Sequence, residues 1–267
     1  VGSVDGEGQP WASIVFGEPG FLRSPEPRTL DVDAELPAGD PLLRSLHAGA
    51  ALGLLGIQPQ TRRRNRMNGA VEQVHGTHFR MHVVRSFGNC PKYIQARTPE
   101  RTTSAAAPHC VRGTTLDAHM QRMINGADTF FIATAVVQED GPAGRPHGAD
   151  VSHRGGKPGF VRIDDDRTLT APDFIGNFLF NTIGNLQLHP RAGLLFIDYA
   201  TGDLLYLAVD ADVIWDGPEV ASFAGAQRLL RFHVRETMLL ERGLPFRWSE
   251  AEFSPALERT GSWTEND

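Results

Sequence analysis

The chain has 267 residues, of which 40% are hydrophobic and 22% are charged. This composition can bury an ordinary core, in one large domain or in two of usual size. The net charge of −6 and the pI near 5.9 argue against a general nucleic-acid binder, which needs a basic face to neutralise phosphates. No apolar run approaches the roughly 20 residues that span a bilayer. We therefore expect a soluble, cytoplasmic protein that binds neither nucleic acid nor a membrane.

The chain contains two cysteines, Cys90 and Cys110, in unlike surroundings. A single disulfide between them is one interpretation, and two reduced thiols in a cytoplasmic protein is the favoured one. Neither cysteine has a second cysteine or a histidine at the short spacings of zinc sites. The sequence therefore predicts no metal site.

An internal repeat relates the two halves of the chain. Residues 17–23 (GEPGFLR) followed by RTL match residues 156–162 (GKPGFVR) followed by RTL, at an offset of 139. Further on, residues 53–57 (GLLGI) match residues 193–197 (GLLFI) at an offset of 140. Two matched blocks at nearly one offset predict two copies of one barrel-like unit.

The first copy reads as short strands separated by turns. Strands are predicted at residues 11–16, 21–22, 51–57, 70–74 and 79–86. Asp40 as N-cap and Pro41 at the first helical position predict a helix over 40–48. The Asn68-Gly69 pair predicts a tight hairpin that leads into the strand at 70–74. Residues 97–113 are predicted to form a linker, followed by a helix over 115–125 that ends at Gly126.

The second copy has the same character with longer apolar strands. Strands are predicted at residues 129–138, 192–198, 204–209 and 227–240. Asp173, Asn177, Asn181 and Asn185 are interleaved with apolar residues at helical spacing, which predicts an amide-lined helix. The polar, acidic tail is predicted to be partly disordered. The domain organisation predicted from these elements is a first repeat at 1–97, a linker and helix at 98–128, a second barrel at 129–248 and the tail at 249–267.

Four sequence blocks of the second copy occur in a characteristic order. They are SHRGGKPGFV at 152–161, RTL at 167–169, PDFIGNFLFNTIGNLQLHPRAGLLFID at 172–198 and TGDLLYL at 201–207. This order resembles the pyridoxamine 5'-phosphate oxidase-like family of FMN-binding split β-barrels, in its predicted flavin-nucleotide-binding branch. The resemblance implies a mainly β fold with a few helices (α+β), an FMN-binding split β-barrel that the repeat duplicates within the chain. It also implies FMN as the cofactor and a homodimer with the flavin at the subunit interface.

The cofactor candidates follow from what FMN requires, which is a phosphate site and a surface for its ring. Phosphate is held well by cationic, hydroxyl and backbone N–H donors, which predicts a site around residues 152–157. The donor candidates are Ser152, His153, Arg154, Gly155 and Lys157. The ring candidates are Phe160, Val161, Asn177, Asn181, Thr182 and Asn185. A solvated turn at 152–154, and capping roles for Asn177 and Asn185, remain the alternatives.

One departure from the resembling family affects the phosphate. Asn181 and Thr182 stand where many relatives of the oxidase itself have a basic pair, so Arg154 or Lys92 would have to compensate. An arginine cluster at 62–66 could also face phosphate, but a charged surface hairpin is favoured there.

Two residues are weak catalytic candidates. His153 could donate a proton to a reduced flavin or a substrate, and Cys90 lies at a turn beside Lys92, where a cation favours the thiolate. In the first copy the residues ahead of the Pro-Gly-Phe block, 14–18, are apolar and then acidic, which disfavours an anionic cofactor. We therefore expect FMN in the second copy only, with Cys90, Lys92 and Tyr93 of the first copy as a wall or lid.

The function predicted is that of an FMN-binding protein, and specifically a flavin-dependent oxidoreductase of unknown substrate. The electron donor is expected to be NAD(P)H or a separate electron-transfer protein. The alternatives are a non-catalytic flavin, deazaflavin or haem-binding protein, and a structural dimerisation module with an empty site.

Overall fold

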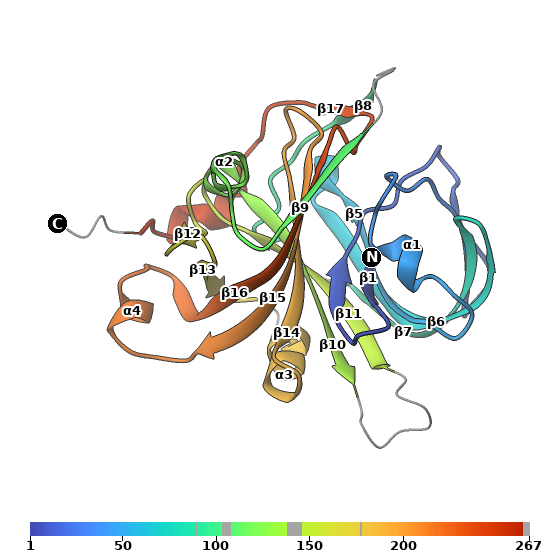
Figure 1. Cartoon of the computed structure of the whole chain (residues 1–267), viewed down its shortest axis with the longest axis horizontal. Helices are drawn as coiled ribbons and strands as arrows, with labels where there is room; N and C mark the ends of the chain where they lie inside the picture. The colour runs from blue at the N-terminus through green and yellow to red at the C-terminus, as the bar shows by residue number, and fades with distance from the viewer. Residues whose placement is uncertain (89, 103–107, 138–145, 177, 264–267) are drawn as a thin grey trace.

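The chain folds into two large antiparallel β-sheets, one from each half of the sequence (Figure 1). The computed structural model describes residues 1–88, 90–102, 108–137, 146–176 and 178–263. Strands account for most of the regular structure in these ranges, and helices are few and short. The mainly β class predicted from the sequence is therefore confirmed.

The first sheet has seven strands in the order β2-β1-β5-β6-β7-β4-β3. Their bounds are β1 Gly2–Val4, β2 Pro10–Ala12, β3 Leu22–Glu26, β4 Thr29–Asp33, β5 Ala51–Gln58, β6 Arg63–His75 and β7 His78–Gly88. One helical turn, α1 (Leu42–Ser45), precedes β5, and a 3₁₀ turn (Pro59–Thr61) joins β5 to β6.

The second sheet contains the longest strand among the described residues, the 16-residue β16. Its strands are β10 Thr129–Val137, β11 Pro146–Gly155, β12 Arg162–Ile163, β13 Thr168–Phe174, β14 Arg191–Ile197, β15 Leu204–Ile214 and β16 Ala226–Glu241. Their order is β11-β10-β14-β15-β16-β13-β12, and β9 (His109–Gly113) adds to β16. The helices are α2 (Ala118–Gly126), α3 (Asn181–Leu188) and α4 (Pro218–Ala221), and β8 (Pro99–Arg101) pairs with β17 (Phe246–Trp248).

The seven-strand paths of the two sheets have the same order. Counted along the chain within each half, both run second, first, fifth, sixth, seventh, fourth, third. The pairing registers correspond as well, since Leu55 lies opposite Arg66 and Leu195 lies opposite Tyr206. Positions 55 and 195, and positions 66 and 206, are both 140 apart, the offset seen in the sequence.

Two corresponding glycines let the halves approach closely. A Cβ at Gly53 would lie 2.7 Å from Asp150 Cα, and a Cβ at Gly193 would lie 2.3 Å from the Pro10 carbonyl oxygen. Each glycine therefore sits against the backbone of the other half's outer strand, Gly53 of β5 on β11 and Gly193 of β14 on β2. Any side chain at these positions would force the halves apart.

Each sheet has an apolar core, and a third cluster joins the halves. The core of the second sheet contains the stacked rings of Phe130, Phe160 and Phe196, with centroids 5.4–5.7 Å apart. The joining cluster packs Trp11 of β2 against buried residues of β14 and β15, including Tyr206. Burial of such large side chains holds the halves together.

Several predicted elements are confirmed. The strand expected at 51–57 is β5, that at 192–198 is β14, and the long strand expected at 227–240 is β16. The helix expected at 115–125 is α2, whose N-cap Asp117 accepts hydrogen bonds from the backbone N–H groups of His119 and Met120. Periodicity was sufficient here because the strands are buried and the helix has a strong cap.

The hairpin predicted at Asn68-Gly69 is wrong. Both residues lie in the middle of β6, and the chain reverses earlier, at the 3₁₀ turn that ends at Arg62 with φ 53°. Gly69 is instead part of a β-bulge, where its Cβ would lie 1.9 Å from the His82 carbonyl oxygen. Position 69 requires a glycine because β7 approaches too closely for a side chain, and not because the chain turns there.

The predicted helices at 173–186 and 40–48 are shorter in the structure. Asp173 belongs to β13, where its carboxylate pairs with two arginines, and α3 begins only at Asn181. Helix α1 is a single turn, although Asp40 still accepts a hydrogen bond from the Leu42 N–H at 2.8 Å. The predicted linker contains β8 and β9.

The tail is folded over the part that the structure describes. A 3₁₀ helix (Pro255–Arg259) buries Leu257, and the Trp263 ring packs edge-on against Phe223 at 4.9 Å. The prediction of a partly disordered tail is therefore wrong for residues 249–263, and 264–267 lie outside the described residues.

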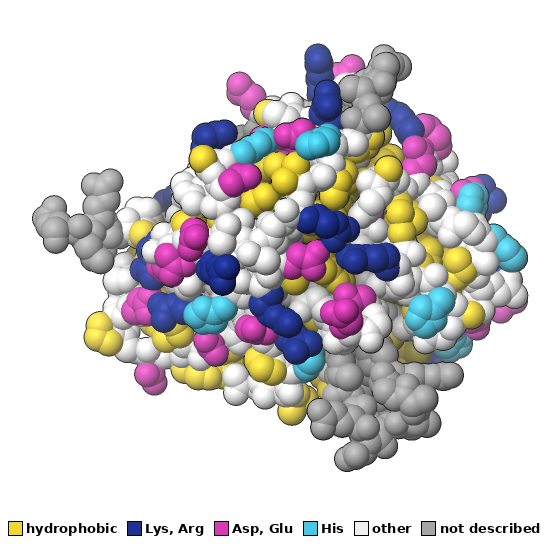
Figure 2. Space-filling model, viewed as in Figure 1, with side chains coloured by type: hydrophobic (Ala, Val, Ile, Leu, Met, Phe, Trp, Pro, Cys, Tyr) yellow, Lys and Arg dark blue, Asp and Glu magenta, His cyan; other side chains and the backbone are white. Residues whose placement is uncertain are grey.

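Basic and acidic side chains are interspersed over the face shown in Figure 2, without a broad patch of either sign. Among the described residues, no helix is both long and apolar enough to cross a membrane.

Candidate functional site

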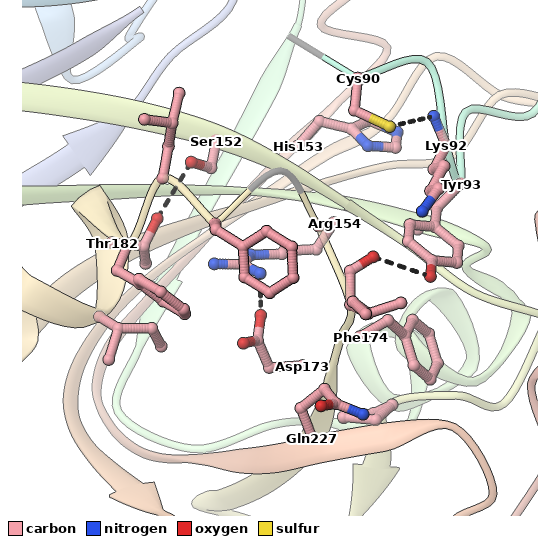
Figure 3. A pocket seen from close by; sticks show the side chains of 18 of the residues that line it. Cys90, Lys92, Tyr93, Ser152, His153, Arg154, Asp173, Phe174, Thr182 and Gln227 are labelled. Atoms are coloured by element: carbon pink, nitrogen blue, oxygen red, sulfur yellow. Dashed lines mark hydrogen bonds and ion pairs between the residues drawn. The ribbon is translucent and has the colours of Figure 1, made fainter.

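A pocket lies where the first half of the chain meets the outer strand β11 and the end of β13 of the second half (Figure 3). We call it the cationic pocket. The first half contributes Arg64, Arg66, Cys90, Lys92 and Tyr93. The second half contributes Ser152, His153, Arg154, Gly155, Pro172, Asp173, Phe174, Ile175, Gly176, Phe178, Leu179, Phe180, Thr182, Ile183, Gln227 and Arg228. One chain therefore supplies side chains from both of its halves to a single pocket.

A buried hydrogen-bonded chain forms one wall. Arg66, only 5% exposed, donates to Asp150 Oδ2 at 3.0 Å and to Ser152 Oγ at 2.5 Å. The Ser152 hydroxyl lies 3.0 Å from the Thr182 hydroxyl at the start of α3. Burial raises the pKa of Asp150 and lowers that of Arg66, and their mutual attraction opposes both shifts. The pair fixes two hydroxyl groups at the pocket wall.

A second ion-paired group forms the floor. Asp173 accepts from Arg154 through Oδ1 and from Arg228 through Oδ2, the latter at 2.6 Å. The Arg228 guanidinium lies between the rings of Phe180 and Trp215, 5.2 and 5.3 Å from their centroids. One carboxylate thus serves two guanidinium groups, which leaves a positive charge in excess.

His153 and Arg64 carry buried polar atoms without a partner in the described structure. The Nδ1 atom of His153 and the Nε atoms of Arg64, Arg66, Arg154 and Arg228 are all in this condition. Burial, together with neighbouring Arg64 and Arg154, lowers the pKa of His153 well below its ordinary value, so its imidazole is neutral. Burial and neighbouring Arg66 lower the pKa of Arg64 to about 10, which still leaves it cationic at neutral pH. A buried polar atom without a partner costs free energy of folding, so this cluster is held together at some cost in stability.

An aromatic and apolar rim borders these cations. The Tyr93 hydroxyl donates to the Ile175 carbonyl at 3.1 Å, and the Tyr93 and Phe174 rings lie 5.2 Å apart. Phe178, 70% exposed, and Phe180 lie at the edge of the same pocket. Cys90 Sγ accepts a weak hydrogen bond from the Lys92 N–H at 3.5 Å (Figure 3). The rim suits a planar apolar group, and the interior suits an anion.

The pocket brings together eight of the residues singled out from the sequence. They are Cys90, Lys92, Tyr93, Ser152, His153, Arg154, Gly155 and Thr182. Gly155 is required by contact between the halves, since its Cβ would lie 1.9 Å from the Tyr93 carbonyl oxygen. The segment around Tyr93 therefore lies directly on β11.

The remaining cofactor candidates lie elsewhere. Phe160 and Val161 are 2% and 0% exposed in the core of the second sheet, because the turn at Gly159 (φ 82°) directs the chain inward. Lys157 Nζ donates to the Thr260 carbonyl at 2.9 Å, so it fastens the C-terminal segment.

The helical amides were also misplaced. Asn185 Nδ2 donates to Thr134 Oγ1 at 3.0 Å, and Asn181, the first residue of α3, does not line the pocket. Both predictions assumed a longer helix facing the ligand. Asn177 lies outside the described residues.

Sequence reasoning assigned Arg64 and Arg66 to a charged surface hairpin, and that assignment is wrong. Both lie on one strand, and alternate residues of a strand face the same side, so Arg64, Arg66 and Asn68 point together toward β11. Reading this run as a strand would have revealed a cationic face. Arg228 was missed because it carries no local motif, and only the pairing of β13 with β16 brings it to Asp173.

No family model and no curated protein sequence matches the chain. Among solved structures, HupZ of Group A Streptococcus is similar at 15% identity, over 45% of this chain and 90% of that one, with a TM-score of 0.34. A candidate pyridoxamine 5'-phosphate oxidase of Lactobacillus delbrueckii is similar at 14% identity, over 47% and 94% of the two chains, with a TM-score of 0.34. An FAD-binding protein of Mesorhizobium loti is similar at 11% identity, over 47% and 96%, with a TM-score of 0.30.

Proposed function

We propose that the cationic pocket binds one FMN per chain and that the protein is a flavin-dependent oxidoreductase, its substrate not yet assigned. The observation that carries the proposal is the cluster of cationic side chains beside an aromatic rim, in which two carboxylates pair with three arginines and Arg64 forms no ion pair with any described residue. FMN is a dianionic phosphate joined to a planar ring, so it complements both parts. The sequence blocks that resemble FMN-binding split β-barrels support the same ligand.

The phosphate end would be held by residues already fixed in place. Ser152 and Thr182 offer adjacent hydroxyl groups, and Arg154 and Arg64 offer guanidinium donors near them. Charge-assisted hydrogen bonds from such groups are the strongest available to a phosphate. This set replaces the basic pair absent at Asn181 and Thr182.

The flavin would supply the hydride and electron chemistry, and the protein would position it. Tyr93, Phe174 and Phe180 offer apolar surface to the ring. His153, held neutral by burial between arginines, can donate or accept one hydrogen bond without adding charge. The electron donor stays a prediction, either NAD(P)H or a separate electron-transfer protein.

We also propose that the two halves are copies of one split-barrel unit. The shared strand order and the corresponding contacts of Gly53 and Gly193 support this. The resemblance predicts a homodimer, but both halves of one chain already line the cationic pocket. A second copy is therefore not needed to complete it.

The phosphate requirement tests the ligand assignment. Titration of the purified protein with FMN and with riboflavin, followed by flavin fluorescence, is expected to give riboflavin an affinity weaker by roughly 100-fold or more, about 2.7 kcal/mol. Equal affinities would contradict a phosphate site, and no binding of either would overturn the proposal. Bound FMN that neither NADH nor NADPH reduces would favour a protein donor or the non-catalytic alternative.

A further inference from the structure

The positive charge of the cationic pocket exceeds what one FMN phosphate neutralises. Among the described residues, five cationic side chains line the pocket, and the two carboxylates paired with them, Asp150 and Asp173, leave an excess of three positive charges. A phosphate monoester carries about −1.5 to −2 at neutral pH. At least one positive charge therefore remains beside bound FMN.

A second hollow adjoins the pocket and is also basic. We call it the arginine hollow, and it is lined by Gly56, Ile57, Gln58, Thr61, Arg62, Arg63, Arg64, Asn65, Gly88 and Pro91. Arg64 lines both spaces, and Pro91 of the hollow directly precedes Lys92 of the pocket. Of the described residues that line the hollow, none is acidic. The two spaces thus share one cation and a stretch of chain.

The three arginines of the hollow differ in what they contact. Arg62 is occupied, since it donates to the Ile94 carbonyl at 3.1 Å and to Glu252 Oε1 at 2.8 Å. Arg63 is exposed, and within the described residues neither it nor Arg64 forms an ion pair. Arg64 Nε is buried without a partner. Both residues line the hollow, and a guanidinium without an ion pair favours a phosphate or carboxylate ligand.

We propose that the arginine hollow binds a phosphate-bearing anionic second reactant beside the flavin, through Arg63 and Arg64. This inference rests on the proposed function. Arg63 is exposed to solvent at the hollow, where an arriving anion can contact it first. Arg64 lines both the hollow and the cationic pocket, so it connects the two spaces. The reactant's phosphate groups would balance the charge that FMN leaves. Recognition of this kind weakens as salt rises, because an exposed guanidinium is screened.

The test uses the FMN-loaded protein and inorganic pyrophosphate as the probe, with binding followed by calorimetry and the flavin spectrum recorded throughout. Pyrophosphate is expected to bind without displacing FMN, and Arg63→Gln to weaken it at least tenfold. Arg28→Gln, an exposed arginine in the turn between β3 and β4, is the matched control and is expected to change nothing. Both variants are expected to retain FMN at wild-type affinity.

The outcomes separate the two proposals. A protein that retains no FMN overturns the proposed function and this inference with it. Retained FMN with no pyrophosphate binding, with displacement of the flavin, or with equal affinity in Arg63→Gln overturns only the second site. The affinities of the FMN-loaded protein for oxidised NADP and for pyrophosphate are then compared to identify the source of the phosphate. Tighter binding of oxidised NADP indicates a pyridine dinucleotide as the reactant, and tighter pyrophosphate binding a simpler phosphate.

Discussion

The two halves of the chain meet along two corresponding faces that differ sharply in chemistry. On one face Arg66 of β6 and Arg154 of β11 line the cationic pocket. At the corresponding positions of the other face stand Tyr206 of β15 and Val15, which follows β2. Tyr206 is fully buried in the apolar cluster that joins the halves. One strand order therefore supports a polar site on one face and an apolar contact on the other, and the side chains at corresponding positions make the difference.

We expect the two faces to contribute to different properties, the apolar face to stability and the cationic face to ligand binding. The apolar face buries large side chains, which stabilises the association of the halves. The cationic face buries guanidinium groups that repel one another, and this costs stability unless each is paired. We therefore expect an anionic ligand to stabilise the molecule mainly through the cationic face.

The largest expected effect comes from breaking the buried pair of the cationic face. Arg66→Ala would leave Asp150 buried without its counter-ion, so the free energy of unfolding is expected to fall by about 3–5 kcal/mol. Urea denaturation without FMN measures this, with Arg28→Ala as a control expected to stay within about 0.5 kcal/mol. A decrease in the free energy of unfolding of less than about 1 kcal/mol for Arg66→Ala would contradict an ion pair that is shielded from water at this face.

A smaller effect is expected on flavin affinity. Arg154→Ala is expected to weaken FMN binding by about 1.5–3 kcal/mol, the range for a lost hydrogen bond to a charged group. The matched variant is Val15→Ala at the corresponding position of the apolar face, which is expected to leave FMN affinity unchanged. Fluorescence titration of both variants compares the two faces directly. An equal loss of FMN affinity in the two variants would contradict the assignment of the flavin site to the cationic face.

Tyr206→Phe probes the apolar face. The Tyr206 hydroxyl donates to Asp40 Oδ2 at 2.7 Å, and both residues are buried. Its removal is expected to lower the free energy of unfolding by about 1–3 kcal/mol, because Asp40 loses a buried partner. FMN affinity is expected to stay at the wild-type value. A weaker FMN complex in this variant would mean that the two faces are coupled.

The pH dependence of stability gives a further, smaller signal at the same face. Burial raises the pKa of Asp40 above the ordinary value of 3.8, and its hydrogen bonds only partly oppose this. Between the unfolded and folded pKa values the folded state binds more protons, so the stability contributed by Asp40 falls as pH rises. Unfolding measured from about pH 4 upward is expected to show this fall for the wild type relative to Asp40→Asn. Parallel curves would remove Asp40 as the source.

The last variant is expected to have no effect on FMN affinity. Glu18→Ala lies in the first copy, where Glu18 accepts a hydrogen bond from exposed Arg101. FMN affinity is expected to be unchanged, as measured by the same titration. A weakened FMN complex would contradict a site confined to the cationic face.

The sequence predicted the strands that are buried and apolar, because alternation and composition suffice where a strand packs on one core. It placed Ser152, His153, Arg154 and Lys92 in one region because they lie near motifs of the resembling family. Local patterns failed where long-range contacts decide the structure. Gly69 looked like a turn residue but relieves a contact with β7, and Asp173 looked helical but is held in β13 by two arginines.

The half of the site contributed by β6 was the least predictable. Arg66 is buried only because β11 of the other half lies against it, a contact made 84 residues away in sequence. Phe160 shows the converse, since an aromatic residue in a motif was taken for a ligand contact but fills the core. Motif position indicates a region of the fold, and tertiary packing decides which side chains reach the ligand.

The amount of FMN retained per chain tests the central claim most directly. The purified protein is saturated with FMN, passed through a gel-filtration column, and its flavin absorbance is compared with its protein concentration and molar mass. One FMN per chain, whatever the oligomeric state, is the predicted result, because one face is cationic and the other is apolar. Two FMN per chain, or none in folded protein, would contradict it.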